Sequence, residues 1–343
     1  MEITFLQGLW FLLIFVLIGG YLVLDGFDLG AGVLYHIVAK TDEEKAIVRR
    51  SVGPVWDGNE VWLLTAGGAL FAAFPAAYAT TFSGFYLAIM LVLFGLIFRA
   101  VSIEYASIDH KWSKFWGVCF TVGSLLPALL FGVAVGNIYA GIPMDANGDY
   151  AGVPFFGLVT PFTLLVGLLG LSFILCQGAA WIALKAPKLS ELRLRAVELR
   201  SILQAVAIVL FVVVTIYALA VVQPEMTGSL AVLRWILAAA IVVCIVASML
   251  QRRNDRDLCA FLLQSVAAFL LVMLLAASMF PNLVVASAGS AGATITAMSA
   301  ASSQLTLTCM TVITCIFLPI VLIYQILVYR KFRGRVSEED LEH

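Results

Sequence analysis

Nine apolar segments, each about 20 residues or longer, limit what this chain can fold into. They occupy residues 9–38, 54–76, 80–100, 115–139, 157–184, 200–222, 230–250, 258–280 and 303–329. A run of about 20 apolar residues crosses the hydrocarbon core of a bilayer as a helix. Barrel strands are shorter and alternate apolar with polar residues, which these segments do not. The sequence therefore predicts an all-α integral membrane protein, with about nine transmembrane helices in a single polytopic domain over residues 1–343.

The composition supports this prediction. Charged residues make up 12% of the chain and hydrophobic residues 62%, whereas soluble domains carry about 25% charged residues. We expect no cleavable signal peptide, because residues 1–8 include Glu2 and no basic residue. The six cysteines lie in or beside apolar segments without a CxxC pair, so we interpret them as small buried side chains. No nucleic-acid partner is expected.

The basic residues predict the orientation in the membrane. Of the 20 Lys and Arg residues, all but Arg234 fall after the first, third, fifth or seventh segment or at the end of the chain. Arg99 is counted in this group, as the residue that closes the third segment. Because basic loops face the cytoplasm, we predict an N-terminus outside and a cytoplasmic C-terminus. That orientation requires an odd number of helices.

Four acidic residues lie inside the first two predicted helices. Asp25 and Asp28 are three residues apart, as are Asp57 and Glu60, so each pair shares a helix face. Counted from the cytoplasmic basic residues, they form a ladder running inward from Asp57 through Glu60 and Asp28 to Asp25. We expect no Lys, Arg or His at matching depth. Burial without a cationic partner favours the protonated carboxyl group, which predicts a path for protons or cations.

Other interpretations of these acids stay open. Asp25 and Asp28 could hold a monovalent cation, the one metal site that the sequence allows, or could bond backbone groups near Gly26. Trp56 and Trp62 flank the second acidic pair and are candidates for lining the same path. Glycines let helices approach closely, and we expect packing at the following ones: Gly26, Gly30, Gly32, Gly67 and Gly68.

The histidines argue against a catalytic or haem site within the chain. There are three, His36, His110 and His343, and all are placed at or beyond the predicted cytoplasmic helix ends. No two of them can face each other inside the membrane, as a bis-histidine haem would require. Nucleotide-binding and metalloprotease motifs are absent from the sequence as well.

Two motifs resemble subunit II of the cytochrome bd ubiquinol or menaquinol oxidases. One is Leu-Asp-Gly-Phe-Asp-Leu-Gly-Ala-Gly at 24–32, and the other begins Trp-Asp-Gly-Asn-Glu-Val-Trp and covers 56–75. Shorter matches follow at 82–86, 132–137, 177–179 and 302–307, so the resemblance spans nearly the whole chain. The chain departs from the longer members at 222–229, where its outer loop is short.

The resemblance implies a respiratory role. Subunit II is the haem-free partner of a homologous subunit I, which carries two haems b and one haem d, oxidises quinol and reduces oxygen to water. The heterodimer works in the cytoplasmic (inner) membrane of bacteria or archaea as part of aerobic electron transport. Some members hold a structural quinone in this subunit, and the resemblance leaves open a third, small single-helix subunit. We expect two four-helix bundles plus one extra helix.

The resemblance also implies residue roles. Asp57 and Asp28 match positions on a proton path toward haem d, and Trp62 matches a position near a hydrophobic oxygen route. On this view the chain supports assembly, supplies cytoplasmic protons and has no catalytic centre of its own. The alternative from another class is a secondary transporter, coupled to protons or cations through Asp25 and Asp28.

Overall fold

The computed structural model describes residues 3–106, 108–222, 230–254 and 256–336, which are almost entirely helical. Within them, eight helices are long and apolar enough to cross a membrane. They are α1 (Phe5–Val38), α5 (Tyr86–Tyr105), α6 (Ser113–Ala140), α7 (Pro161–Lys185), α8 (Glu191–Tyr217, continued by a π-turn to Val222), α9 (Ala231–Leu250), α10 (Asp257–Met279) and α11 (Gln304–Lys331). Most of the loop predicted to be short, 222–229, lies outside the described residues.

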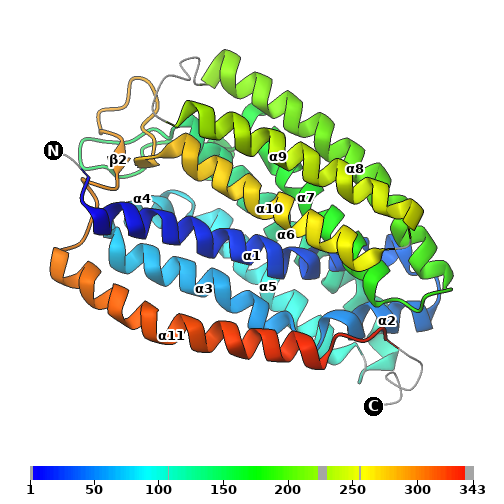
Figure 1. Cartoon of the computed structure of the whole chain (residues 1–343). Coiled ribbons are helices and arrows are strands. Elements are labelled where there is room, and N and C mark those ends of the chain that lie inside the picture. The colour runs from blue at the N-terminus through cyan, green and yellow to red at the C-terminus, as the bar shows by residue number, and fades with distance from the viewer. Residues whose placement is uncertain (1–2, 107, 223–229, 255, 337–343) are drawn as a thin grey trace.

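The second predicted segment, 54–76, is divided in the structure. Its main part is α3 (Trp56–Ala73), which runs alongside α1 and α11 (Figure 1). The helix ends because Pro75, which has no backbone N–H, opens the separate short helix α4 (Pro75–Gly84). Polar residues in its first turns make α3 less apolar than the other eight helices, so the count of nine and the orientation stay predictions.

The contacts between the helices follow the expected two bundles only in part. Helices α1, α3, α5 and α6 form one set, and α7, α8, α9 and α10 form another, while α11 lies against α1 and α3 (Figure 1). The two sets pack on each other extensively, through α6 against α7 and α1 against α10, and they also meet where α1 crosses α7. There a Cβ added to Gly30 would lie 2.1 Å from the carbonyl oxygen of Ile174, so only glycine permits this approach.

The other expected glycine contacts differ among themselves. Gly32 packs against Ser124 of α6, whereas Gly26 has only ordinary contacts near 3.8 Å. A Cβ added to Gly67 or Gly68 on α3 would have no described atom within 4 Å, so the expected packing there is wrong within this chain. These two glycines lie on an open face of the helix.

A short helix between the first two predicted segments was not expected. This helix, α2 (Asp42–Val52), begins with a capping box in which Thr41 and Glu44 bond each other's backbone N–H groups. Its buried side chains Ile47, Val48 and Val52 pack into the cluster around the end of α7. Although burial raises the pKa of Glu44, the N–H groups of Lys40 and Thr41 and the Arg195 guanidinium outweigh it and lower that pKa.

The remaining segments cover the two ends of the bundle. After α10, the strands β1 (Asn282–Val284) and β2 (Ile295–Thr296) pair antiparallel, and residue 142, after α6, bridges to residue 286 beside them. Short 3₁₀ turns lie at η1 (His110–Trp112), η2 (Phe156–Leu158) and η4 (Gln251–Asn254). All six cysteines are free thiols, but three of them, Cys259, Cys309 and Cys315, are exposed on the chain rather than buried.

Candidate functional site

Five polar side chains from three helices meet inside the first helix group. Asp25 and Asp28 come from α1, Asn59 and Glu60 from α3, and Arg99 from α5. Nη1 of Arg99 donates to Oδ1 of Asp25 at 2.6 Å, and its Nη2 donates to Oε2 of Glu60 at 3.1 Å. Nδ2 of Asn59 donates to Oδ2 of Asp28 at 2.7 Å. We call these five residues the acid–arginine cluster.

The expectation of acids without a positive partner was wrong, and so was the placement of Arg99. Helix α5 continues to Tyr105, so Arg99 is a fully buried residue within it rather than one at the cytoplasmic end of the third segment. A long guanidinium side chain at this point reaches two carboxylates on different helices. It neutralises one negative charge of the cluster.

Close helix packing brings these side chains together. On α5, Gly95 lies one turn before Arg99, and a Cβ added to the facing Gly123 of α6 would be 2.6 Å from its carbonyl oxygen. On α1, a Cβ added to Gly20 would lie 2.4 Å from the Trp62 ring. The small residues therefore let α5 and α3 approach their neighbours, which sets Arg99 and the start of α3 beside Asp25.

The cluster contains more acid than base. Asp25, Asp28 and Glu60 face one guanidinium, and Asp25 and Asp28 are 0% and 1% exposed. One oxygen of each, Oδ2 of Asp25 and Oδ1 of Asp28, is buried without a hydrogen-bond partner among the described residues. Because an uncompensated buried charge is costly, the surplus carboxyl groups must hold protons, water or a cation.

A chain of polar contacts leads from the cluster to α11. Oδ1 of Asn59 accepts from Nε2 of Gln325 at 2.9 Å and from the hydroxyl of Tyr329 at 2.7 Å. Since Asn59 also donates to Asp28, these contacts link the end of α11 to the buried carboxyl group. This link was not predicted.

The remaining candidates lie away from the buried centre. Asp57 is exposed in the first turn of α3, although it is close enough for its charge to act on Glu60. Trp62 packs over Gly20, and Trp56 packs beside the cluster of apolar residues at the end of α7. The structure thus brings Asp25, Asp28 and Glu60 together and leaves Asp57 on the surface of the chain.

Comparison with known proteins decides the family. A family model described as cytochrome bd terminal oxidase subunit II matches residues 6–332. The chain belongs to this family. Subunit II is thus a component of an oxidase complex, as the resemblance predicted.

The relatives match this subunit II chain over its full length. It is 35% identical to cytochrome bd-I ubiquinol oxidase subunit 2 of Escherichia coli K12, covering 98% of this chain and 97% of that one. It is 34% identical to cytochrome bd ubiquinol oxidase subunit 2 of Bacillus subtilis 168, covering 98% of each. A chain of the bd oxidase structure from Geobacillus thermodenitrificans shares the fold, with a TM-score of 0.77 at 16% identity over 96% of this chain and 99% of that one.

Four residues in or beside the acid–arginine cluster were missed from the sequence: Asn59, Arg99, Gln325 and Tyr329. A signal existed for Gln325, because a polar amide inside an apolar segment marks a functional position by default. Arg99 carried a weaker one, since no Gly or Pro follows it before Tyr105 to end the helix. Tyr329 carried none. In the part of the chain that the structure describes, no three His, Cys, Asp or Glu side chains are grouped as a metal site.

Proposed function

We propose that this chain is the haem-free subunit of a cytochrome bd quinol:oxygen oxidoreductase, in which it supports assembly and conducts protons from the cytoplasmic side toward its partner. The observation that carries the proposal is the surplus of buried carboxyl groups over the single Arg99. Groups that are forced to share protons in a dry interior can pass them on when a neighbour's charge changes.

An open face of α3 supports a docking site for the haem-bearing subunit I. Five exposed residues of α3 recur three or four positions apart, as on the contact face of a packed helix: Asp57, Val61, Leu64, Gly68 and Phe71. Of these, Asp57 is charged and Gly68 is small. Leu64 and Phe71 are 69% and 60% exposed, and the open space at Gly68 admits a neighbouring helix. A carboxylate on a membrane-facing surface is costly, so a partner that covers Asp57 stabilises the assembly.

The proposed path starts at Asp57 and runs through Glu60 to the buried cluster. The Glu60 side chain is 22% exposed and contacts Arg99, so it connects the α3 face with Asp25. Asn59 positions Asp28 in the same cluster through a hydrogen bond. Its amide does not titrate, so it does not carry protons itself. Trp62, on the neighbouring turn of α3, is our candidate for the wall of the oxygen route.

The haems belong to the partner in this proposal. His36 is exposed at the end of α1, and the side chains of His110 and His343 lie outside those described. Among the described residues, no histidine side chain therefore lies inside the helix groups to ligate a haem. Bound in subunit I, the haems supply the redox chemistry that transfers electrons from quinol to oxygen.

The test is an Asp57→Asn substitution in the complete oxidase complex. We expect oxygen reduction to slow by about tenfold or more, the range in which a lost proton donor acts, with haem content and yield unchanged. Asp42→Asn on α2 removes another exposed acid, outside the path, and should leave the rate unaltered. If the loss of activity followed the loss of haem in proportion, Asp57 would have a structural role and the path would not begin there.

A further inference from the structure

A cavity of about 160 Å³ lies where the ends of α2, α7 and α11 meet the start of α3. Its described lining residues include four basic side chains and three aromatic ones, and no carboxylate. The basic ones are Arg50, Lys185, Lys331 and Arg335, and the aromatic ones are Trp181, Tyr329 and Phe332. A single water needs roughly 10–15 Å³ of such space, so the cavity has room for a phosphate group. It lies at the end of the molecule that the basic residues predict to be cytoplasmic.

Lys185 brings to this cavity a charge that no carboxylate of the described residues compensates. Its side chain is almost fully enclosed, at 6% residue exposure. Its Nζ donates to the carbonyl oxygens of Phe332 and Gly334, and among the described residues it forms no ion pair. The two carbonyl groups accept from two of its three N–H donors and leave the positive charge in place.

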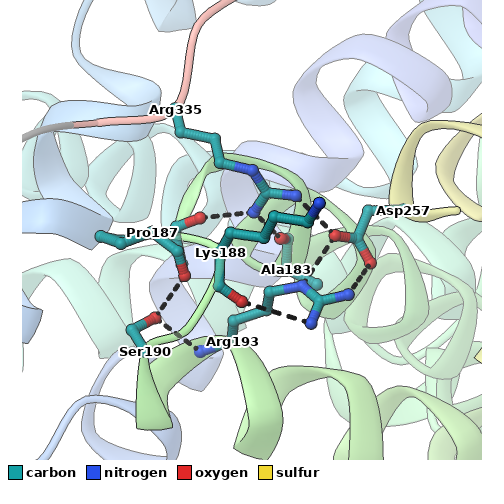
Figure 2. A network of polar contacts seen from close by, with 8 residues as sticks. Ala183, Pro187, Lys188, Ser190, Arg193, Asp257 and Arg335 are labelled. Carbon is teal, nitrogen blue, oxygen red and sulfur yellow. Dashed lines mark hydrogen bonds and ion pairs between the residues drawn. The ribbon is translucent and has the colours of Figure 1, made fainter. Parts of the chain in front are cut away.

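Arg335 adds positive charge to the cavity lining, because it shares its carboxylate partner, Asp257, with Arg193. Nη2 of Arg335 donates to Oδ2 of Asp257 at 2.7 Å, and the same oxygen accepts from Nε of Arg193 at 2.8 Å (Figure 2). Two guanidinium groups therefore share one carboxylate. Asp257 by itself cannot neutralise both of them.

Two further basic residues stand at the rim. Arg50 and Lys331 are both exposed, and neither makes an ion pair with a described residue. They are long and flexible side chains that can turn toward an anion in the cavity. Next to them, α11 presents an apolar outer face, on which Ile323, Ile326 and Leu327 are 57% to 59% exposed.

We propose that this cavity binds the phosphate of an anionic phospholipid headgroup. Basic pockets between membrane helices on the cytoplasmic side bind anionic lipid headgroups, and the apolar face of α11 would receive the acyl chains. Inorganic phosphate offers the same anionic chemistry from solution. The two sources are distinguished by using both as probes.

The experiment measures binding to the detergent-purified, delipidated complex. The probes are phosphatidylglycerol, the zwitterionic phosphatidylethanolamine, and inorganic phosphate. The test variant carries Arg50→Gln and Lys331→Gln together. Because both side chains are exposed, we expect this variant to keep its fold. The matched control is Arg330→Gln with Arg333→Gln, which removes two exposed charges from the same end of α11 without touching the lining.

We expect phosphatidylglycerol binding to weaken roughly 25-fold at low salt in the lining variant, since each basic residue near a lipid phosphate contributes about fivefold. The control pair should lose far less, and phosphatidylethanolamine should bind weakly to all forms. Binding of inorganic phosphate alone, with the same dependence on the lining pair, would assign the site to a soluble phosphate. Equal losses in both pairs, or none, would overturn the proposal.

The acidic residues that follow Val336 in the sequence provide a last check. A full-length chain with Glu338→Gln, Glu339→Gln and Asp340→Asn is compared with the wild type. If the wild type bound neither probe and this variant bound both, the chain's own C-terminal residues would be the occupant. That result would also overturn the ligand proposal.

Discussion

Arg99 determines the charge state of the first helix group. It is fully buried and contacts carboxylates on two other helices, so it ties α1, α3 and α5 together. Its charge also fixes how many carboxyl groups can stay ionised. One guanidinium cannot balance three carboxylates, so the ionised cluster would carry a surplus negative charge. Stability, and in our proposal proton handling, therefore depend on the same side chain.

Replacing Arg99 tests this dependence. Arg99→Met removes the cation and leaves Asp25 and Glu60 buried without a partner, which should cost about 3–5 kcal/mol. We expect a lower thermal unfolding temperature and poor recovery of the complex. Asp25→Leu should also impair assembly, because it leaves Arg99 with Glu60 alone. The double variant should recover part of the loss, and a double variant no better than either single one would contradict the pairing.

Acidic residues of the site could be predicted from the sequence, whereas their partners could not. Asp25, Asp28 and Glu60 stand out because carboxyl groups inside apolar segments are rare. Arg99 lies at the edge of such a segment, where a basic residue ordinarily marks the membrane boundary. Its true place depends on how far α5 continues and on what lies beside it, which is tertiary information. The same holds for Tyr329, whose hydroxyl reaches Asn59 only through the packing of α11.

At the scale of helices, close contacts at glycines set the spacing of the bundle. Apolar length predicted the helices well, as with α9, whose observed bounds of Ala231–Leu250 differ by one residue from the prediction. Ends were predicted less well where polar residues continue a helix. Helix α8 starts at Glu191 instead of residue 200, because Arg193, Arg195 and Arg200 lie within it rather than in a loop.

The contact between α1 and α7 can be tested with two glycines of the same helix. Gly30→Ala would push a methyl group against the backbone of α7, and overpacking of this kind costs about 1–3 kcal/mol or more. Gly26→Ala meets only contacts near 3.8 Å and should be neutral, or stabilising by up to about 1 kcal/mol. Thermal unfolding of the two purified variants provides the comparison. Equal destabilisation would mean that the close approach at Gly30 does not limit packing.

The start of α2 should respond to acid. Because the pKa of Glu44 is lowered in the folded chain, Glu44 contributes fully to stability at any pH above 4.5, the usual pKa of a glutamate. That contribution is lost as the pH falls below 4.5 and through the lowered value, because protonation weakens its bonds to Lys40, Thr41 and Arg195. Glu44→Gln should remove this acid-sensitive part of the unfolding temperature between pH 6 and pH 3, a range of about three units. The exposed neighbour substitution, Glu43→Gln, should keep the wild-type profile.

The whole molecule presents very different surfaces on its two sides. Helix α11 and the outer face of α3 are open, and so are α8 and α9 on the opposite side (Figure 1). Lipid can cover apolar side chains such as those of α8 and α9 without a partner. The face of α3 is different, since it combines a carboxylate, an open glycine and large apolar residues in one stripe. This combination favours a protein neighbour over lipid.

A bulky residue at Gly68 should separate assembly from folding. Because no described atom lies within 4 Å of a Cβ added there, Gly68→Phe should leave this chain's own packing intact. It would nevertheless fill the space that a helix of the partner needs. We expect the variant to reach the membrane in normal amount but to recover at most about a tenth of the haem-bearing subunit in pull-down, which corresponds to about 1.4 kcal/mol of lost association energy. Val243→Phe on α9, where the side chain is 65% exposed on the other side of the molecule, is the matched control and should assemble normally. If Gly68→Phe assembled normally, the interface with the partner would not lie on α3. Asp57 would then not form the entrance of the proposed path.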